Sequence, residues 1–350
     1  MTSTRYPELI VSGSPRHLGQ QIGEAAREQI RGFCEVALER VNRTMKVTAD
    51  AAAVVVAEST RFVADWCPDL LEELTGTAEG AGITVAELML LQIRNQLTNE
   101  VESGCTSLSV GGHGSHAPLV AQNWDNDPVL DQFTVVLTRR PTGKPATMMC
   151  TQAGLISYVG FSETGIGACV NTLPAPARGT GVPHYFVLRQ MYDAASLDEA
   201  VSVVTSAHRA IPVNIMLATP QGPANLEATI DSLRVLTPTL APGVTHTNHC
   251  LHPDFEHINA DFPELIESHP RKHRIDELLL SHDAPNPDRV KEALRDHHGH
   301  PTSICRHENP DPEHGFWTTV FSIVIQPSLR RMQVSRGTPC DHPFETYTMA

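Results

Sequence analysis

The stretch ESGCTSLSV, residues 102–110, is where the character of this 350-residue sequence changes. A glycine, Gly104, directly precedes Cys105, and small hydroxyl residues then alternate with apolar ones as they do in a strand. Two interpretations of Cys105 are open at this point. It is either a buried strand cysteine or a nucleophile that becomes the N-terminus of a new chain.

The chain before Gly104 is predicted to be mostly helical. Apolar residues recur at helical spacing over 14–45, 48–66, 68–82 and 84–98. Ser14, Thr48 or Asp50, and Thr84 are expected N-caps, the first of them followed by a proline at the first helical position. Gly80 and Gly82 are expected to end the third helix.

Strand patterns dominate after Cys105. Short segments at 105–110, 118–124, 132–140, 146–152, 155–162 and 165–173 are divided by Gly, Pro and Asp, which is typical of an antiparallel meander. Two helices follow at 183–208, strands return at 212–240, helices at 263–297, and two strands close the chain at 316–337. This order predicts one α+β domain with sheets inside and helices outside.

Composition limits the classes of partner. The formal net charge is −14 with no basic run, which argues against nucleic acid and anionic membrane surfaces. No apolar stretch approaches the ~20 residues of a membrane-spanning helix, and the N-terminus has no secretory pattern. The eight cysteines are scattered without a C-x-x-C pair, so reduced thiols in a cytoplasmic protein are expected.

Cys105 after a glycine suits self-cleavage. Glycine permits close approach of a nucleophile, so the Cys105 thiol can attack the Gly104 carbonyl, and water can hydrolyse the resulting ester-like bond. The product carries Cys105 as its first residue. Its α-amine titrates near pH 8 and lies beside its own thiol, so one residue supplies both nucleophile and general base.

Five segments in order, GCTSL, QNWDN, CVNTL, THTNHC and PTSICRH, resemble the isopenicillin-N acyltransferase family of the N-terminal-nucleophile (Ntn) hydrolases. The similarity spans nearly the whole chain. It implies a four-layer αββα sandwich and autocatalytic cleavage between Gly104 and Cys105. Residues 1–104 would form a helical pro-segment or α chain, and residues 105–350 the catalytic β chain.

The resemblance also implies roles for individual residues. Cys105 matches the nucleophile, Asp125 the carboxylate that orients the α-ammonium, and Asn248 a side-chain donor of the oxyanion hole. Asn171 matches a second donor, expected to act through its backbone N–H, and Arg306 a guanidinium near the thiol. Each residue also has a simpler interpretation. Asp125 could be a turn aspartate, Asn248 a loop asparagine, Asn171 a strand-end asparagine and Arg306 part of a surface salt bridge.

The substrate class is bounded less closely. Bile salt hydrolases carry a further arginine before the aspartate, whereas this chain has Ala121, Gln122 and Asn123 there, so bile-salt substrates are not expected. A small N-acyl amine or an acyl thioester is expected as substrate, with no cofactor. Tyr158, Phe161 and Tyr185 are candidate substrate-binding residues, although each also suits a core position. A homo-oligomer is compatible with the sequence.

Eighteen histidines raise the alternative of a zinc hydrolase. His246, His249 and His252 cluster around Cys250, and His297, His298 and His300 form a second group. Neither spacing matches a standard zinc motif, so polar surface or pocket-lining histidines are the favoured interpretation. A third hypothesis is a non-catalytic binding domain with an uncleaved chain. Cleavage before Cys105, thiol alkylation and chelation distinguish the three.

Overall fold

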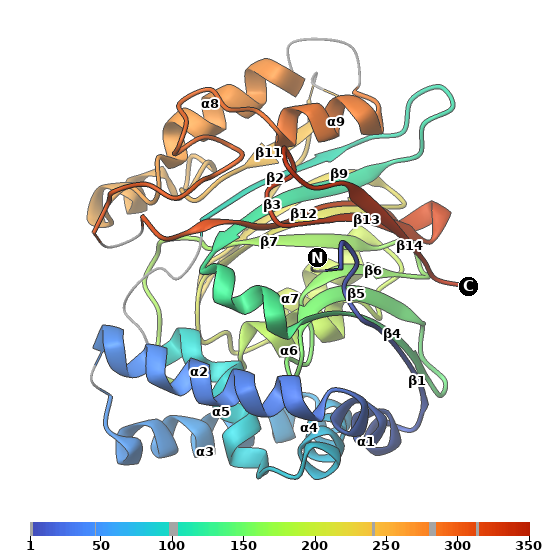
Figure 1. Ribbon diagram of the computed structural model, residues 1–350, viewed down its shortest axis with the longest axis vertical. Helices are drawn as coiled ribbons and strands as arrows, with labels where there is room; N and C mark the ends of the chain where they lie inside the picture. Colours follow the sequence, from blue (N-terminus) through green and yellow to red (C-terminus); the bar gives the residue numbers. More distant parts are fainter. Residues whose placement is uncertain (1–2, 46, 98–103, 240–241, 280–284, 313–314) are drawn as a thin grey trace.

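Two β-sheets pack face to face, and helices cover both outer faces (Figure 1). The computed structural model describes residues 3–45, 47–97, 104–239, 242–279, 285–312 and 315–350. The predicted α+β class and the four-layer αββα order are therefore confirmed. The helices are α1 Pro15–Ala25, α2 Arg27–Met45, α3 Ala49–Trp66, α4 Pro68–Ala81, α5 Val85–Leu97, α6 His184–Met191, α7 Leu197–Ser206, α8 Ser268–Leu279 and α9 Pro287–Leu294.

The larger sheet has eight strands in the order β1-β4-β5-β6-β7-β8-β9-β10. From β4 to β10 it is an antiparallel meander, because each strand pairs with the next along the chain. The meander predicted over 105–173 is therefore divided, since β2 and β3 belong to the smaller sheet. Its strands are β1 Glu8–Gly13, β4 Thr134–Pro141, β5 Thr147–Gln152, β6 Val159–Ser162, β7 Gly167–Asn171, β8 Val213–Thr219, β9 Gly222–Ala228 and β10 Leu233–Leu236.

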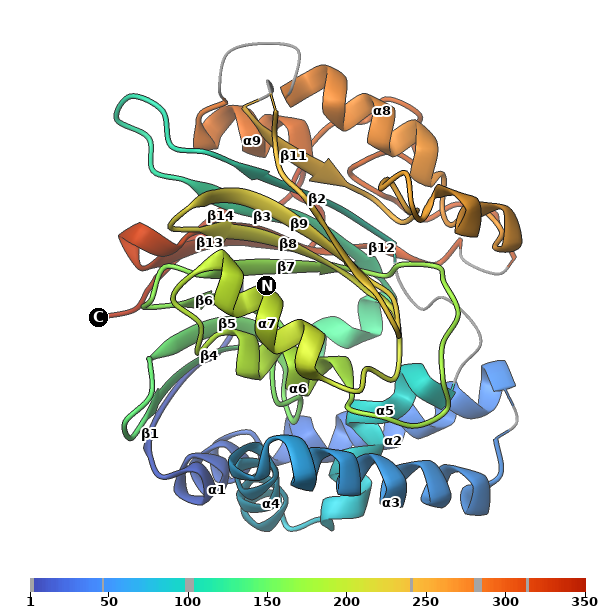
Figure 2. The same ribbon diagram turned by 180° about the vertical axis from the view of Figure 1, so that it is seen from behind.

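The smaller sheet has six strands in the order β11-β2-β3-β12-β13-β14 and carries the segment that begins at Gly104. Helices α8 and α9 cover its outer face, while α6 and α7 lie on the far face of the larger sheet (Figures 1 and 2). Its strands are β2 Gly104–Val110, β3 Leu119–Asn126, β11 Gly243–His246, β12 Thr318–Gln326, β13 Arg331–Arg336 and β14 Phe344–Thr348.

The helix ends follow their local chemistry, with three departures from prediction. The first predicted helix is two helices that break at Ala26, and Ser14 makes no capping hydrogen bond within the described chain. Thr48 caps α3 through the Ala51 N–H. Gly82, at φ +68°, ends α4, whereas Gly80 lies inside that helix. The short 3₁₀ helices η1 Pro128–Phe133, η2 Glu256–Asp261 and η3 Pro327–Leu329 lie between elements.

Three strands, β1, β11 and β14, are absent from the sequence-based prediction. β1 pairs in parallel with β4, more than a hundred residues further along the chain, so no local turn signals it. β11 and β14 each have only four or five residues and lie at the two edges of the smaller sheet.

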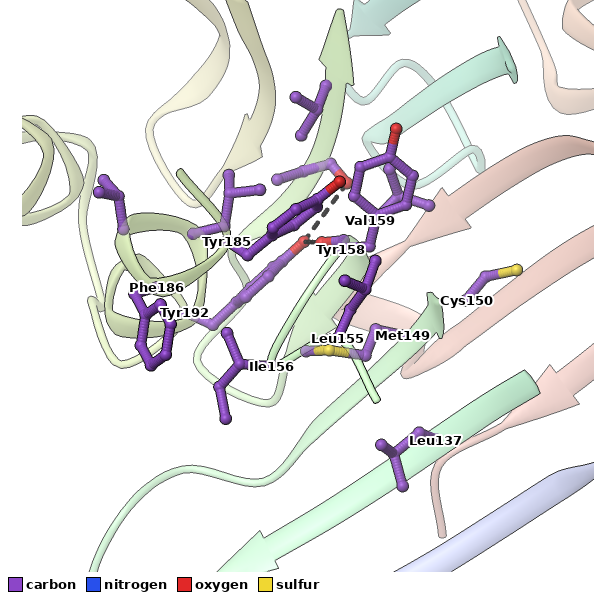
Figure 3. Packing of buried hydrophobic residues seen from close by; sticks show 14 of the residues in the cluster. Leu137, Met149, Cys150, Leu155, Ile156, Tyr158, Val159, Tyr185, Phe186 and Tyr192 are labelled. Carbon is purple, nitrogen blue, oxygen red and sulfur yellow. Dashed lines mark hydrogen bonds between the residues drawn. The ribbon is translucent and has the colours of Figure 1, made fainter. Parts of the chain in front are cut away.

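The N-terminal helices share one apolar core with the sheets. Buried side chains of α1–α5 and of the strands after Cys105 belong to a single cluster, part of which appears in Figure 3. Glu73 of α4 and Arg139 of β4 form a buried ion pair at 2.7 Å across the two segments. Within the described residues, no helix is long and apolar enough to span a membrane.

Candidate active site at Cys105

The alternation of β2 directs Cys105 into the space between the two sheets. Leu108 and Val110 pack on the apolar cluster under α8 and α9, so the odd-numbered residues face the other way. Ser107 accordingly bonds Asn171 of the opposite sheet at 2.6 Å. The Cys105 side chain lies in the main core and is 1% exposed. The thiol is therefore shielded from bulk water.

Asp125 lies beside the bond before Cys105. In the ladder of β2 and β3, it is the partner of Gly104. Its Oδ1 accepts a hydrogen bond from the Thr319 hydroxyl at 2.7 Å, while its buried Oδ2 has no hydrogen-bond partner in the described part of the chain. A Cβ placed on Gly104 would lie 3.5 Å from that Oδ2. One carboxylate oxygen is thus directed at Gly104 without a donor.

Burial governs the charge of Asp125. Removal from water raises the pKa of its carboxyl to about 6, because desolvation outweighs Arg271, the Thr319 hydrogen bond and Arg306, which all favour the ionised form. A cation formed next to Oδ2 would restore the charged form. The carboxyl therefore sits where it would respond to a newly formed α-ammonium.

Asn248 contacts Cys105 through its carbonyl oxygen. Oδ1 accepts from the Cys105 N–H at 2.9 Å and from Arg271 at 2.8 Å, and these two donors fix the amide orientation. The amide nitrogen donates to Thr172 O at 3.0 Å. The amide group expected to donate to an oxyanion is thus engaged with Thr172 O, and the role of Asn248 as an oxyanion donor stays a prediction.

Asn171 reaches the same residue from the larger sheet, with its side chain rather than its backbone. Its Oδ1 accepts from Ser107, and from Asn214 at 3.3 Å, so its Nδ2 faces Cys105 O at 3.3 Å. The described contact of Asn171 with Cys105 is made by its side chain, and the expectation that it acts through its backbone N–H stays a prediction.

Arg271 of α8 is the site residue that sequence reasoning missed. Its guanidinium is fully buried and donates to Cys105 O at 2.7 Å, to Thr106 Oγ1 at 2.9 Å and to Asn248 Oδ1. Because it lies within the polar run PRKHR, its residue type gives only a weak signal. That signal is helical position, since only one face of a helix packs on a sheet.

Arg306 is buried and lies close enough to Asp125 to favour ionisation of its carboxyl. The expected place of Arg306 near the Cys105 thiol stays a prediction. Arg306 pairs with Glu267 at 3.1 Å, and its backbone N–H donates to the same Thr319 hydroxyl that serves Asp125. Two guanidinium groups, Arg271 and Arg306, therefore accompany one buried carboxyl. Glu267 offsets the charge of Arg306, so Arg271 is the cation that directly contacts Cys105 and would favour a developing oxyanion there.

The backbone is strained where α8 begins. Ile266 and Glu267 both adopt φ +48°, a region that a β-branched residue such as Ile266 rarely enters. Ile266 O accepts from Arg271 Nε at 2.9 Å, and Glu267 holds Arg306. Any side chain at Gly104 would meet Ile266 Cδ1 at 2.8 Å. The strain thus coincides with the contacts that organise the site.

Comparison with known proteins places nearly the whole chain beside sequence relatives. The model of the acyl-coenzyme A:6-aminopenicillanic acid acyl-transferase family matches residues 112–341. The chain belongs to this family. One relative in Emericella nidulans, the acyl-coenzyme A:6-aminopenicillanic-acid-acyltransferase 40 kDa form, is 29% identical over 349 residues, covering 96% of this chain and 94% of that protein.

Two solved structures are more distant from this acyltransferase-family chain. A conjugated bile acid hydrolase from Clostridium perfringens has 12% identity, a TM-score of 0.45, and covers 70% of this chain and 97% of its own. A penicillin V acylase from Agrobacterium tumefaciens has 14% identity, a TM-score of 0.43, and covers 66% and 83% respectively. At these TM-scores the superpositions add nothing to the fold described above.

The aromatic residues that the sequence offered for substrate binding are all buried in this family member. Trp124, the ladder partner of Cys105, meets Tyr158 edge-on at 5.7 Å, and Tyr158 meets Tyr185 at 5.8 Å. Figure 3 shows Tyr158 and Tyr185 packed together, next to Tyr192, which donates to Tyr158 O at 2.9 Å. Phe161 lies in β6, paired with Met148 and Gly167.

The histidines around Cys250 have separate partners. His246 contacts Glu227 at 3.0 Å, His249 contacts Ser268 at 2.7 Å, and His252 accepts from the Asp254 N–H at 3.1 Å. Among the residues that the structure describes, they do not form a metal-binding group. Burial opposes ionisation of Glu227, yet His246 and two backbone N–H donors lower the pKa of its carboxyl. Glu227 thereby fixes the loop that carries Asn248.

Proposed function

We propose that this acyltransferase-family chain is a precursor that cleaves itself before Cys105 and then works as an N-terminal cysteine amidohydrolase or acyltransferase. The observation that carries the proposal is the pair of contacts at Cys105. Its N–H is held by Asn248, and the Asp125 Oδ2 directed at Gly104 has no hydrogen-bond donor among the residues that the structure describes. Both are acceptors suited to the α-ammonium that cleavage would create.

Cleavage would begin with attack of the Cys105 thiol on the Gly104 carbonyl carbon. The acyl group moves from the Cys105 nitrogen to its sulfur, and the nitrogen takes up the thiol proton. Water then hydrolyses the thioester, which leaves a carboxylate on Gly104 and a free α-amine on Cys105. The products would be an α chain of residues 1–104 and a β chain of residues 105–350.

In the mature enzyme the α-amine would act as the base for its own thiol. An acyl donor, either an N-acyl amine or an acyl thioester, would acylate Cys105, and the protonated amine would release the leaving group. Water or a second amine would then take the acyl group. Asp125 and Asn248 would orient the α-amine, while Asn171 and Arg271 would fix the backbone of the nucleophile from either side.

We base the proposed substrate class on the family. The relative from Emericella nidulans carries acyl-coenzyme A and an aminopenicillanic acid in its name. For this chain we propose a small N-acyl amine or acyl thioester, with no cofactor. Tyr158 and Tyr185 are proposed to line the acyl side, because they belong to the aromatic group that contacts the ladder partner of Cys105.

Covalent trapping tests this function. Purified protein is incubated with a series of N-acyl amides and acyl thioesters, and the mass of each chain is measured after a rapid acid quench. The acyl mass is expected on the 105–350 chain, and addition of an acceptor amine should convert hydrolysis into transfer. Alkylation of Cys105 should abolish both reactions.

Cys34→Ser is the matched control, because Cys34 is a half-buried thiol on α2 away from the site. It should acylate and turn over as the wild type does. Acyl transfer that survives Cys105→Ala, or an acyl group found on another residue, would exclude the proposed nucleophile.

A further inference from the structure

A second group of reactive side chains lies outside the active site, on the surface beyond α9. It consists of His297, Cys305, His307 and Cys340, whose ligand atoms all lie within 4.8 Å of one another. His297 and His307 flank a turn-rich segment after α9, and Cys340 lies in the connection between β13 and β14. Two separate parts of the chain therefore meet at one point.

Four of the six distances between ligand atoms are close to those of a tetrahedral metal site, and the other two, from His297 to the cysteines, are within 4.8 Å. Zn–S bonds of about 2.3 Å and Zn–N bonds of about 2.05 Å require separations of about 3.8 Å between two sulfurs, about 3.5 Å between sulfur and nitrogen, and about 3.3 Å between two nitrogens. The two sulfurs lie 3.6 Å apart. His307 Nε2 lies 3.6 Å from Cys305, 3.5 Å from Cys340 and 3.1 Å from His297 Nε2.

Hydrogen bonding alone does not account for this convergence. A neutral imidazole nitrogen carries either one proton or one lone pair, so His307 Nε2 can bond only one of its three neighbours well. A cation at the centre would satisfy all four atoms together. His297 is exposed and can turn toward the ion, whereas Cys305 is buried and fixed through its N–H to Asp296 O at 3.1 Å.

We propose that His297, Cys305, His307 and Cys340 bind one structural Zn²⁺ ion in Cys₂His₂ geometry. Two thiolates and two neutral imidazoles are a ligand set typical of closed structural zinc sites. Binding releases the two thiol protons, and the site is then electrically neutral. This departs from the sequence-based expectation that the chain holds no metal, and it uses only His297 of the histidine groups that the sequence singled out.

The site would also fix a segment that reaches the active site. Arg306 lies between Cys305 and His307 in the sequence, and its side chain turns the other way, to Glu267. Its N–H and C=O both bond Thr319, at 3.0 Å to the hydroxyl and 3.1 Å from the backbone N–H. A zinc ion would hold the residues on either side of Arg306 to the β13–β14 connection.

Metal titration tests the proposal without recourse to enzymatic activity. The full chain is prepared as Cys105→Ala, stripped of metal under reducing conditions and titrated with Co²⁺. We expect one Co²⁺ per chain with visible bands of a tetrahedral ion and ultraviolet thiolate charge transfer, both removed by one equivalent of Zn²⁺. Two protons per ion should be released in weakly buffered solution.

Single-ligand variants make the test specific. Cys340→Ser and His297→Ala should each weaken Co²⁺ binding by roughly 100-fold or more, since each removes one of four ligands. Both residues are at least partly exposed, so folding is not at risk. His298→Ala, an exposed neighbour, is the matched control and should bind as the parent does.

Two results would overturn the inference. One is Co²⁺ binding without thiolate charge transfer, or binding equal in the ligand variants and the parent. The other is a Cys305–Cys340 disulfide that forms in the purified chain while the freshly reduced chain takes up no metal. Because Cys105 is absent from every protein used, neither result bears on the proposed self-cleavage.

Discussion

At the scale of the residue, the polar contacts of Cys105 come from three distant segments. Asn171 ends β7, Asn248 follows β11 and Arg271 lies in α8, yet all three reach the backbone of one cysteine. Buried polar groups of this kind are costly unless each has its partner. The loss of one member should therefore affect the others.

Arg271→Lys should reduce turnover and self-cleavage by roughly 10²-fold while the chain remains folded. Lysine keeps the charge but cannot reach Cys105 O, Thr106 and Asn248 together with one ammonium group. Rates of chain cleavage and of acyl transfer measure the effect. Arg274→Lys, three residues along α8 and paired with Asp296, should leave both rates unchanged.

Asp125 should give the uncleaved precursor a recognisable pH dependence. Its pKa is raised to about 6 by burial, so the folded chain binds more protons than the unfolded chain between pH ~4 and ~6, and stability is lost as pH rises through that range. As pH rises from 4 to 7, the unfolding free energy of Cys105→Ala should fall by up to about 3 kcal/mol more than that of the double variant Cys105→Ala/Asp125→Asn. Denaturant titrations at pH 4 and pH 7 measure it. If the unfolding free energies of the two variants change equally between these pH values, the pKa of Asp125 is not raised.

Most of the residues near Cys105 could be named from the sequence, because short motifs retain their order and spacing. Arg271 could not, since its role depends on which face of α8 meets β2. The unpaired oxygen of Asp125 could not be foreseen either, because hydrogen-bond satisfaction depends on the neighbouring strand β12 and on Thr319.

At the scale of the element, two contacts between neighbouring segments should be measurable. In the first, α1 and α4 cross with their backbones in direct contact. A Cβ on Gly19 would lie 2.0 Å from Glu73 O, so Gly19→Ala must push the helices apart. We expect a loss of about 1–3 kcal/mol in unfolding free energy, measured by urea denaturation. A Cβ on Gly179 would have no described non-neighbouring atom within 4 Å, so Gly179→Ala should lower the unfolding free energy far less.

In the second, β9 supports the loop that carries Asn248. Glu227 accepts hydrogen bonds from His246 and from the N–H groups of Leu251 and His252. Glu227→Gln would place an amide donor against one of these donors, which should lower the unfolding free energy by about 1–3 kcal/mol. The same change should slow self-cleavage, because it would displace the loop that carries Asn248. Cleavage rate and urea denaturation test this. Glu256→Gln, on the exposed η2, is the control and should match the wild type.

Element prediction succeeded where signals are local. Thr48 and Gly82 bound α3 and α4 as predicted, and the strands from β4 to β10 lie where short apolar runs alternate with turn residues. Prediction failed for β1 and β11, whose pairing partners lie far along the chain, and for β14, a five-residue edge strand that pairs with its neighbour β13. Parallel pairing and short edge strands leave no periodic pattern of their own.

At the scale of the whole molecule, the pro-segment and the sheets share one apolar core. Apolar side chains from α1–α5 pack with those of both sheets, and Glu73 bonds Arg139 across the proposed chain division. We expect residues 1–104 to stay bound to 105–350 after cleavage. The two chains should co-elute in gel filtration and separate only in denaturant. A β chain that elutes alone in native buffer would contradict the shared core.

Layer order and family follow from the sequence, whereas convergence of distant residues does not. His297, Cys305, His307 and Cys340 are spread over more than forty positions, without a standard zinc spacing. Only the fold brings the β13–β14 connection against the segment after α9. Sites assembled in this way are the ones that sequence patterns miss.

The central claim is that Cys105 cleaves its own chain, and denaturing intact-mass spectrometry of the wild type beside Cys105→Ala tests it most directly. The account predicts that the wild type yields two species, with the masses of residues 1–104 and 105–350, and that Cys105→Ala remains one chain. If both proteins remain uncleaved, or if both are cleaved equally, the claim is contradicted.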